Sequence, residues 1–143
     1  MYNTPFKGPR RLRSDSQGNL WIAAFPESMI VKFAPKTETF SNYPLPVKPL
    51  GSETPYSLNV DIKRDIVWIN GNTSDALYSY HIDEKKWSHY PLPKRVSFTR
   101  DIEIAPVSCS RCKFCFKRVS PTEIQGEAKV ELQIRNNITI FKE

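Results

Sequence analysis

Three regularly spaced cysteines are the residues of this sequence best suited to metal or redox chemistry. Cys109, Cys112 and Cys115 form a Cys-x-x-Cys-x-x-Cys run, a spacing that can wrap a metal ion or an iron–sulfur cluster. A closed site needs four ligands, and the chain contains no fourth cysteine. A redox pair of Cys112 with Cys115 is a second interpretation, and free thiols without a chemical role are a third. We favour the free thiols.

Two histidines, His81 and His89, are the side chains that could serve as general bases near neutral pH. His81 ends a predicted aromatic strand, and His89 precedes Tyr90 on a predicted outer strand. We expect both to be surface or edge side chains. The sequence therefore predicts no catalytic, cofactor-binding or metal-binding residue.

The charge pattern bears on possible partners. The chain has 21 Lys and Arg against 15 Asp and Glu, a formal net charge of +6. The densest basic stretch interleaves Arg111, Lys113, Lys117 and Arg118 with Phe114 and Phe116. Such a stretch can bind single-stranded nucleic acid, but a solvated surface is the commoner cause, so we do not favour nucleic acid.

No apolar run approaches the roughly 20 residues of a membrane span. No signal peptide precedes residue 20, so we expect a soluble chain, cytoplasmic if Met1 is the true start.

An internal repeat organises the elements that would position these residues. Tyr43-Pro44-Leu45-Pro46 recurs as Tyr90-Pro91-Leu92-Pro93, and Leu20-Trp21-Ile22 matches Val67-Trp68-Ile69 at the same displacement of 47. Each copy predicts four short strands separated by polar turns. The predicted strands are 10–14, 20–24, 29–33 and 39–43 in the first copy, and 57–61, 66–70, 76–81 and 86–90 in the second. Four antiparallel strands in about 40–50 residues make one β-propeller blade.

A third copy begins and then breaks off. Residues 99–105 alternate like an inner strand, but no Trp strand follows. Near the end, 129–135 and 138–141 alternate around Asn136-Asn137, which offers a two-residue turn, and this hairpin could complete a damaged blade. The predicted fold is all-β, an incomplete β-propeller of two four-stranded blades plus a partial third. The predicted divisions are 1–8, the end of a preceding element; 9–53 and 54–98, two blades; and 99–143, a partial, irregular blade with a Cys-rich segment at 107–120.

The repeated residues carry a family resemblance. The blade motif of the first copy comprises Gly8-Pro9, Asp15-Ser16-Gln17-Gly18-Asn19-Leu20-Trp21, Ile30-Val31-Lys32-Phe33, Pro35-Lys36-Thr37 and Tyr43-Pro44-Leu45-Pro46. At these residues the chain resembles the virginiamycin B lyase (streptogramin lyase) family of β-propellers. The resemblance covers roughly residues 8–106.

The resemblance implies a reaction as well as a fold. Family lyases open cyclic depsipeptide antibiotics by elimination at an ester, with a histidine base and a bound magnesium ion. In active members an acidic residue often follows the blade Trp by three positions and faces the central channel. Here those positions are Ala24 and Gly71, so both copies lack the carboxylate. Asn70, Asn72 and Thr73 could lie near the channel mouth, but without a base nearby we expect them to be loop residues. No catalytic residue is carried over.

Two blades and part of a third are too few to close a propeller, which typically has four to eight. We expect the outer apolar faces of the first and last blades to be exposed. We therefore expect the chain to be the C-terminal part of a larger propeller or a truncated product, and the alternative is a fragment of which two or three copies complete one ring. A local break of the reading frame at 107–120 would also end the blade pattern. The predicted function is a non-catalytic binding or scaffold segment without a cofactor. The alternative is a magnesium-dependent carbon–oxygen lyase of cyclic depsipeptide esters, completed by other blades or subunits, and a metal or redox module built on the cysteines is a third hypothesis.

Overall fold

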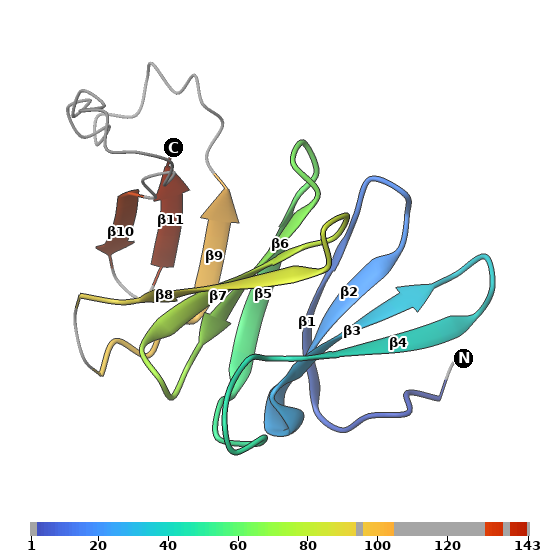
Figure 1. The fold of residues 1–143 in the computed structure, drawn as a ribbon, viewed down its shortest axis with the longest axis horizontal. Helices are drawn as coiled ribbons and strands as arrows, with labels where there is room; N and C mark the ends of the chain where they lie inside the picture. Colours follow the sequence, from blue (N-terminus) through green and yellow to red (C-terminus); the bar gives the residue numbers. More distant parts are fainter. Residues whose placement is uncertain (1–2, 94–95, 105–130, 136–137, 143) are drawn as a thin grey trace.

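The computed structural model describes residues 3–93, 96–104, 131–135 and 138–142 as three β-sheets standing next to one another (Figure 1). Within these residues the one helical element is a short 3-10 turn, η1 (Phe25–Glu27). It contains Pro26, whose fixed φ suits the start of such a turn. The predicted all-β class is confirmed.

The first two sheets are four-stranded antiparallel meanders. The first consists of β1 (Pro9–Ser14), β2 (Leu20–Ala24), β3 (Met29–Ala34) and β4 (Thr39–Pro44), in that order. The second consists of β5 (Pro55–Asp61), β6 (Ile66–Gly71), β7 (Ala76–His81) and β8 (Lys86–Pro91). The strand positions agree with the predicted ones to within two residues at each end. The agreement arises because turn residues bound every β-branched or aromatic run.

The third sheet departs from this pattern. It has the order β10-β11-β9, from β9 (Asp101–Ile104), β10 (Glu131–Arg135) and β11 (Ile138–Lys142). The predicted hairpin is present, because β10 pairs antiparallel with β11. The predicted turn at Asn136-Asn137 lies outside the described residues. However, β11 pairs parallel with β9, whereas the first two sheets contain antiparallel pairs alone. The third sheet is therefore not a regular meander.

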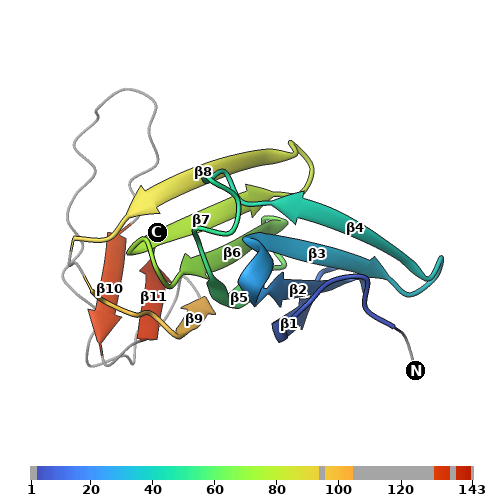
Figure 2. The same cartoon turned by 90° about the horizontal axis from the view of Figure 1, so that it is seen from below.

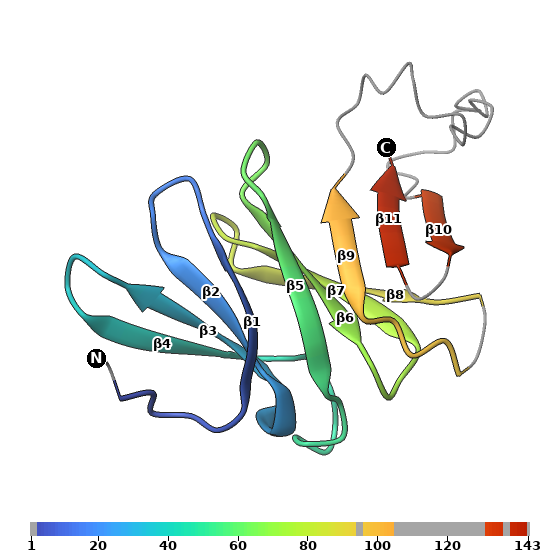
Figure 3. The same cartoon turned by 180° about the vertical axis from the view of Figure 1, so that it is seen from behind.

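The first strand of each sheet lies on the same side of the molecule. Figure 3 shows β1, β5 and β9 side by side, and Figure 2 shows β4 and β8 on the opposite side. We call β1, β5 and β9 the inner strands. The sheets fan out from them without closing into a ring, as an incomplete propeller does.

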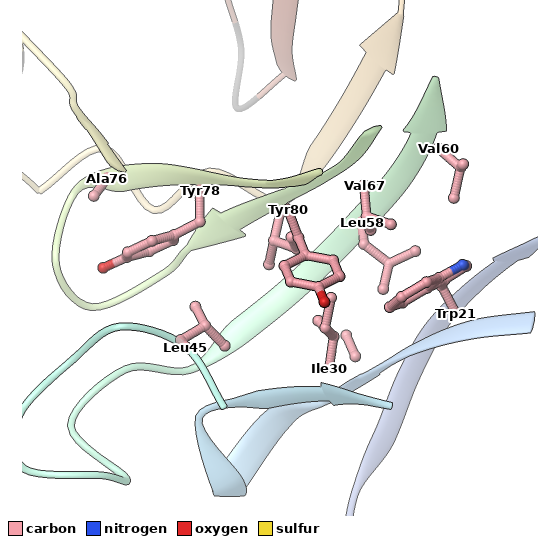
Figure 4. Packing of buried hydrophobic residues seen from close by; sticks show 11 residues of the cluster. Trp21, Ile30, Leu45, Leu58, Val60, Val67, Ala76, Tyr78 and Tyr80 are labelled. Atoms are coloured by element: carbon pink, nitrogen blue, oxygen red, sulfur yellow. The ribbon is translucent and has the colours of Figure 1, made fainter. Parts of the chain in front are cut away.

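The largest apolar core fills the space between the first two sheets, which we call the first interface (Figure 4). Its buried residues are Trp21, Ala23, Ile30, Leu45, Leu58, Val60, Val67, Ile69, Ala76, Tyr78 and Tyr80. A smaller core, the second interface, joins the second sheet to β9 through Ile66, Trp68, Leu77, Leu92 and Ile102. Successive residues of β6 therefore supply both interfaces, because strand side chains alternate between faces.

The outer face of the first sheet is covered, which differs from the expected exposure. Phe6 packs on Ile22, Val31 and Phe33, and all four side chains are buried. The backbone N–H of Phe25 donates to the carbonyl of Gly8 at 3.1 Å, which fixes the segment beside η1. Residues 3–8, here called the covering segment, contain no strand but bring one aromatic ring onto the face that a preceding blade would cover.

Candidate binding site on the inner strands

The two positions at which a lyase blade often carries an acidic residue have no polar side chain. Ala24 ends β2 and Gly71 ends β6, and both are buried. The space beside Gly71 is already filled, since a Cβ at this residue would lie 2.5 Å from Oε2 of Glu53. Glu53 thus places a carboxylate next to the second of these positions, from the connection before β5. Glu53 belongs to no motif of the sequence that predicts this role.

Five hydrogen-bond donors surround the Glu53 carboxylate. Its carboxylate accepts hydrogen bonds from the backbone N–H of Thr54 at 2.8 Å, the N–H of Thr73 at 2.9 Å and the hydroxyl of Thr73 at 2.7 Å. The N–H of Ser74 donates at 3.2 Å and the Tyr78 hydroxyl at 3.4 Å. With 1% of its surface exposed, Glu53 ties the β6–β7 turn to the connection before β5.

The electrostatics of Glu53 agree with a structural role. Burial alone would raise its pKa, but the hydrogen bonds from Ser74, Thr73 and Thr54 outweigh burial and hold the pKa below its ordinary value. The carboxylate is therefore charged at neutral pH and a weak base. Since five donors occupy its lone pairs, it offers no open coordination position to a metal ion.

Both histidines lie on the strands that the sequence predicts for them. His81 is the last residue of β7 and is half-buried, and His89 is exposed on β8. The His89 ring lies 5.1 Å from that of Tyr78. Neither histidine is on an inner strand.

Asn70 differs from the expectation of a loop residue. It lies within β6 and is fully buried. Its Oδ1 accepts from the N–H of Ser57 at 2.6 Å, and its Nδ2 donates to the carbonyl of Thr99 and, at 3.2 Å, to Oγ1 of Thr99. The amide therefore links β5 and β6 to the segment just before β9. Asn72 and Thr73 lie in the β6–β7 turn, as predicted.

No metal centre is formed by the part of the chain that the structure describes, where no three His, Cys, Asp or Glu side chains gather. Cys109, Cys112 and Cys115 lie outside the described residues. Glu53, the carboxylate beside Gly71, does not fit a magnesium ion, because its oxygens already accept hydrogen bonds from N–H and O–H groups. Within the same residues, no helix is long and apolar enough to cross a membrane.

The inner strands instead present a cluster of cations and rings. The β1–β2 register shifts between Pro9 and Leu12, and the β5–β6 register shifts between Pro55 and Leu58. Arg10-Arg11 and Tyr56-Ser57 thus occupy equivalent irregular positions in the two repeats. Irregularities of this kind re-aim side chains and are frequent next to functional sites.

The first layer of this cluster is cationic and aromatic. The guanidinium carbon of Arg10 lies over two rings, 4.5 Å from the ring centroid of Phe25 and 4.6 Å from that of Tyr56. Arg100, the residue before β9, lies 5.9 Å from the same Tyr56 centroid. Phe25 and Tyr56 are perpendicular at 6.0 Å. Tyr56 thus lies close to one cation of β1 and to another from the residue that precedes β9.

The second layer is an ion pair that crosses β5. Nη2 of Arg11 lies 3.8 Å from Oδ2 of Asp101, and the Ser57 hydroxyl donates to Oδ1 of Asp101 at 3.2 Å. We call both layers together the inner-strand cluster; its members are Arg10, Arg11, Phe25, Tyr56, Ser57, Arg100 and Asp101.

The first layer has unused donors. Arg10 and Arg100 are exposed, and within the described residues neither forms an ion pair or donates a side-chain hydrogen bond. A guanidinium stacked on a ring keeps its N–H groups for a planar anion. The sequence analysis did not predict this layer. The one signal for it is that Arg10 and Tyr56 occupy the same position of the repeat, directly after Pro9 and Pro55.

Comparison with known proteins identifies the fold. No protein-family model and no curated protein matches the sequence. The chain is similar to virginiamycin B lyase from Staphylococcus aureus in selenomethionine-substituted form, with a TM-score of 0.59 and 21% identity over 69% of this chain and 32% of that chain. It is similar to a catalytically inactive variant of that lyase with quinupristin, at 23% identity, the same TM-score and the same coverage.

A third similar structure is a streptogramin B lyase, with a TM-score of 0.60 and 20% identity over 70% of this chain and 32% of that chain. At these identities the likeness shows the fold. The predicted lyase-like β-propeller is thereby confirmed, and the chain spans about a third of the length of these lyases.

Proposed function

We propose that this chain is a non-catalytic β-propeller segment that binds a ligand or partner through its inner strands. The observation that carries the proposal is the state of the two blade positions, Ala24 and Gly71. Ala24 has no polar side chain, and the space beside Gly71 is filled by the Glu53 carboxylate, which already accepts five hydrogen bonds.

Elimination at an ester requires two groups that the described residues do not bring together. A base must reach the proton beside the carbonyl, and a cation must stabilise the developing enolate. His81 and His89 lie on β7 and β8, away from the inner strands. The inner-strand cluster offers exposed guanidinium groups and rings, which suit binding.

The alternative is a magnesium-dependent lyase of cyclic depsipeptide esters, with its site completed by other blades or a second copy of the chain. The fold shared with the streptogramin lyases favours it. The chain would be incubated with quinupristin and magnesium while mass spectrometry follows opening of the macrocycle. We expect an intact macrocycle, and chelator-sensitive opening would contradict a non-catalytic role.

Self-association bears on the same alternative and needs its own measurement. Light scattering coupled to size-exclusion chromatography would give the mass of the species incubated with quinupristin. An intact macrocycle in the presence of a monodisperse dimer or trimer would exclude a site completed by copies of this chain. An intact macrocycle with a monomer would leave the other blades as the one remaining way to complete a site.

A further inference from the structure

We infer that Arg10 and Arg100 form a binding site for a small polyanion that carries carboxylate or phosphate groups. The inference rests on the proposed binding role of the inner strands and names the ligand class. The site lies where β1, β5 and β9 run side by side (Figure 3), and both guanidinium groups lie close to the Tyr56 ring.

Two aromatic rings restrain the exposed Arg10 side chain. Its guanidinium contacts the rings of Phe25 and Tyr56 at 4.5 and 4.6 Å, and these rings contact each other at 6.0 Å. Phe25 is in turn held by the hydrogen bond from its N–H to the carbonyl of Gly8. A cation that is already oriented loses less conformational entropy on binding, so more of the interaction energy appears as affinity.

The charge around the site is unbalanced. Asp101 is the acidic member of the inner-strand cluster, and Arg11 and Ser57 both engage it. The remaining arginines, Arg10 and Arg100, carry two positive charges without an anionic partner among the described residues. Both guanidinium carbons lie within 5.9 Å of the Tyr56 ring centroid, which favours a ligand with two or more anionic groups over a single one.

The chemistry of guanidinium defines the ligand class. Its planar N–H fork matches a carboxylate or a phosphate with two parallel hydrogen bonds. Citrate would represent the carboxylate source and inorganic pyrophosphate the phosphate source. Isothermal titration of the whole chain with each compound, at low and physiological ionic strength, measures both affinities. We expect saturable binding of at least one compound, weakened by added salt.

Three variants with the same change in charge locate the site. Arg10→Gln and Arg100→Gln should each raise the dissociation constant about tenfold, since each removes a charge-assisted pair of hydrogen bonds. Lys86→Gln, at an exposed lysine of β8, should leave the affinity within about twofold, because β8 lies on the opposite side of the molecule from the inner strands (Figure 2). Circular dichroism would verify that the three variants fold alike.

Binding of citrate alone assigns the site to carboxylates, and binding of pyrophosphate alone assigns it to phosphates. Saturable binding of neither compound would overturn the inference, as would an equal loss in all three variants, which would indicate diffuse attraction. Opening of quinupristin would contradict the proposed function, but it would not affect the evidence from the titrations for a polyanion site. Failure of the titrations would remove the polyanion site without making the chain an enzyme.

Discussion

The first and second interfaces are formed by the same repeated side chains, yet they differ in what faces those side chains. Trp21 and Tyr43 of the first sheet contribute to the first interface, as Trp68 and Tyr90 of the second sheet contribute to the second. Each repeat therefore provides one half of an interface, and the next sheet provides the other half.

Opposite Trp21 and Tyr43 stands a complete sheet with further aromatic rings. Tyr80 lies 5.8 Å from Trp21 and 5.0 Å from Tyr43, and Trp87 extends the stack at 4.9 Å from Tyr80. Ring pairs at these distances stabilise a core beyond the area that they bury. The first interface is thus a continuous aromatic stack across two sheets.

Opposite Trp68 and Tyr90 stands the short strand β9. The two rings contact each other at 5.5 Å, but the described side chains of the third sheet add Ile102 and the partly buried Ile104 to this core. Polar bonds reinforce the contact, among them Asn59 Nδ2 donating to the carbonyl of Ile102 at 2.9 Å. Among the described residues, the second interface thus combines a smaller apolar core with hydrogen bonds from Asn59 and Asn70.

The largest expected effect tests the two tryptophans against each other. We expect Trp21→Ala to lower the free energy of unfolding by about 3–5 kcal/mol, the usual range for a buried Trp. Trp68→Ala should cost at least about 1 kcal/mol less, because Trp68 is 8% exposed, whereas Trp21 is fully buried and its Nε1–H also donates to Asp15 at 3.0 Å. Urea denaturation followed by circular dichroism would measure both. Equal losses would show that the two interfaces are equally strong.

The covering segment allows the outer face of the first sheet to be compared with both interfaces. We expect Phe6→Ala to cost about 2 kcal/mol, less than the roughly 3–5 kcal/mol of a central Phe→Ala substitution, because Phe6 covers this face from one side only. The uncovered face, with Ile22, Val31 and Phe33, should promote self-association. Light scattering would detect it. Leu50→Ala, at an exposed apolar residue, is the control, and a stable monomeric Phe6→Ala would show that the covering segment is dispensable.

The polar bonds of the second interface predict a local effect. Asn70→Ala would leave the buried N–H of Ser57 without its acceptor and remove both bonds to Thr99. We expect a loss of about 2 kcal/mol, within the range for an unsatisfied buried group. Hydrogen exchange should accelerate in β9 more than in β2. Uniform acceleration in both strands would mean that Asn70 supports the whole stack and not the second interface.

The sequence predicted the first two sheets because local signals and repeated spacing agree there. The strand predicted at 66–70, and observed at Ile66–Gly71, is a β-branched run bounded by polar turns. Its Val67-Trp68-Ile69 matches Leu20-Trp21-Ile22 one repeat earlier. The parallel pairing of β9 with β11 had no such signal, because pairing between distant strands depends on which edge remains free. The Asn70 prediction failed for a related reason, since its partners Ser57 and Thr99 are 13 and 29 residues away.

The candidate site was harder to predict than the fold. The absence of an acidic residue at positions 24 and 71 was readable directly. The roles of Glu53 and Arg10 could not be predicted in this way, because they depend on residues that fold next to them, such as Gly71 and Tyr56. A side chain whose partners belong to other sheets leaves no periodic trace in the sequence.

The smallest expected effect concerns the polar end of the first interface, where Glu53 meets Tyr78. Glu53→Gln keeps the shape and one acceptor oxygen but loses the charge that strengthens the hydrogen bonds. We expect a cost of about 1 kcal/mol at pH 7. Asn42→Gln, at an exposed residue of β4, should have no measurable effect on the free energy of unfolding.

The pH dependence of unfolding separates this charge from packing. The pKa of folded Glu53 lies below its ordinary value, so the unfolded chain binds more protons in acid. The stabilisation by Glu53 is therefore fully present above the ordinary pKa of 4.5 and is lost as the pH falls through the lower, folded value. Asp15, whose pKa is also lowered because hydrogen bonds from Asn19, Trp21 and Gln17 outweigh burial, contributes to the same loss of stability in acid.

Urea denaturation between pH 7 and 3 would measure this loss. The free energy of unfolding should fall less steeply for Glu53→Gln than for the unmodified chain, and Asp15 accounts for part of the fall that remains. Identical declines would show that the first interface depends on its apolar and aromatic contacts and not on the Glu53 charge.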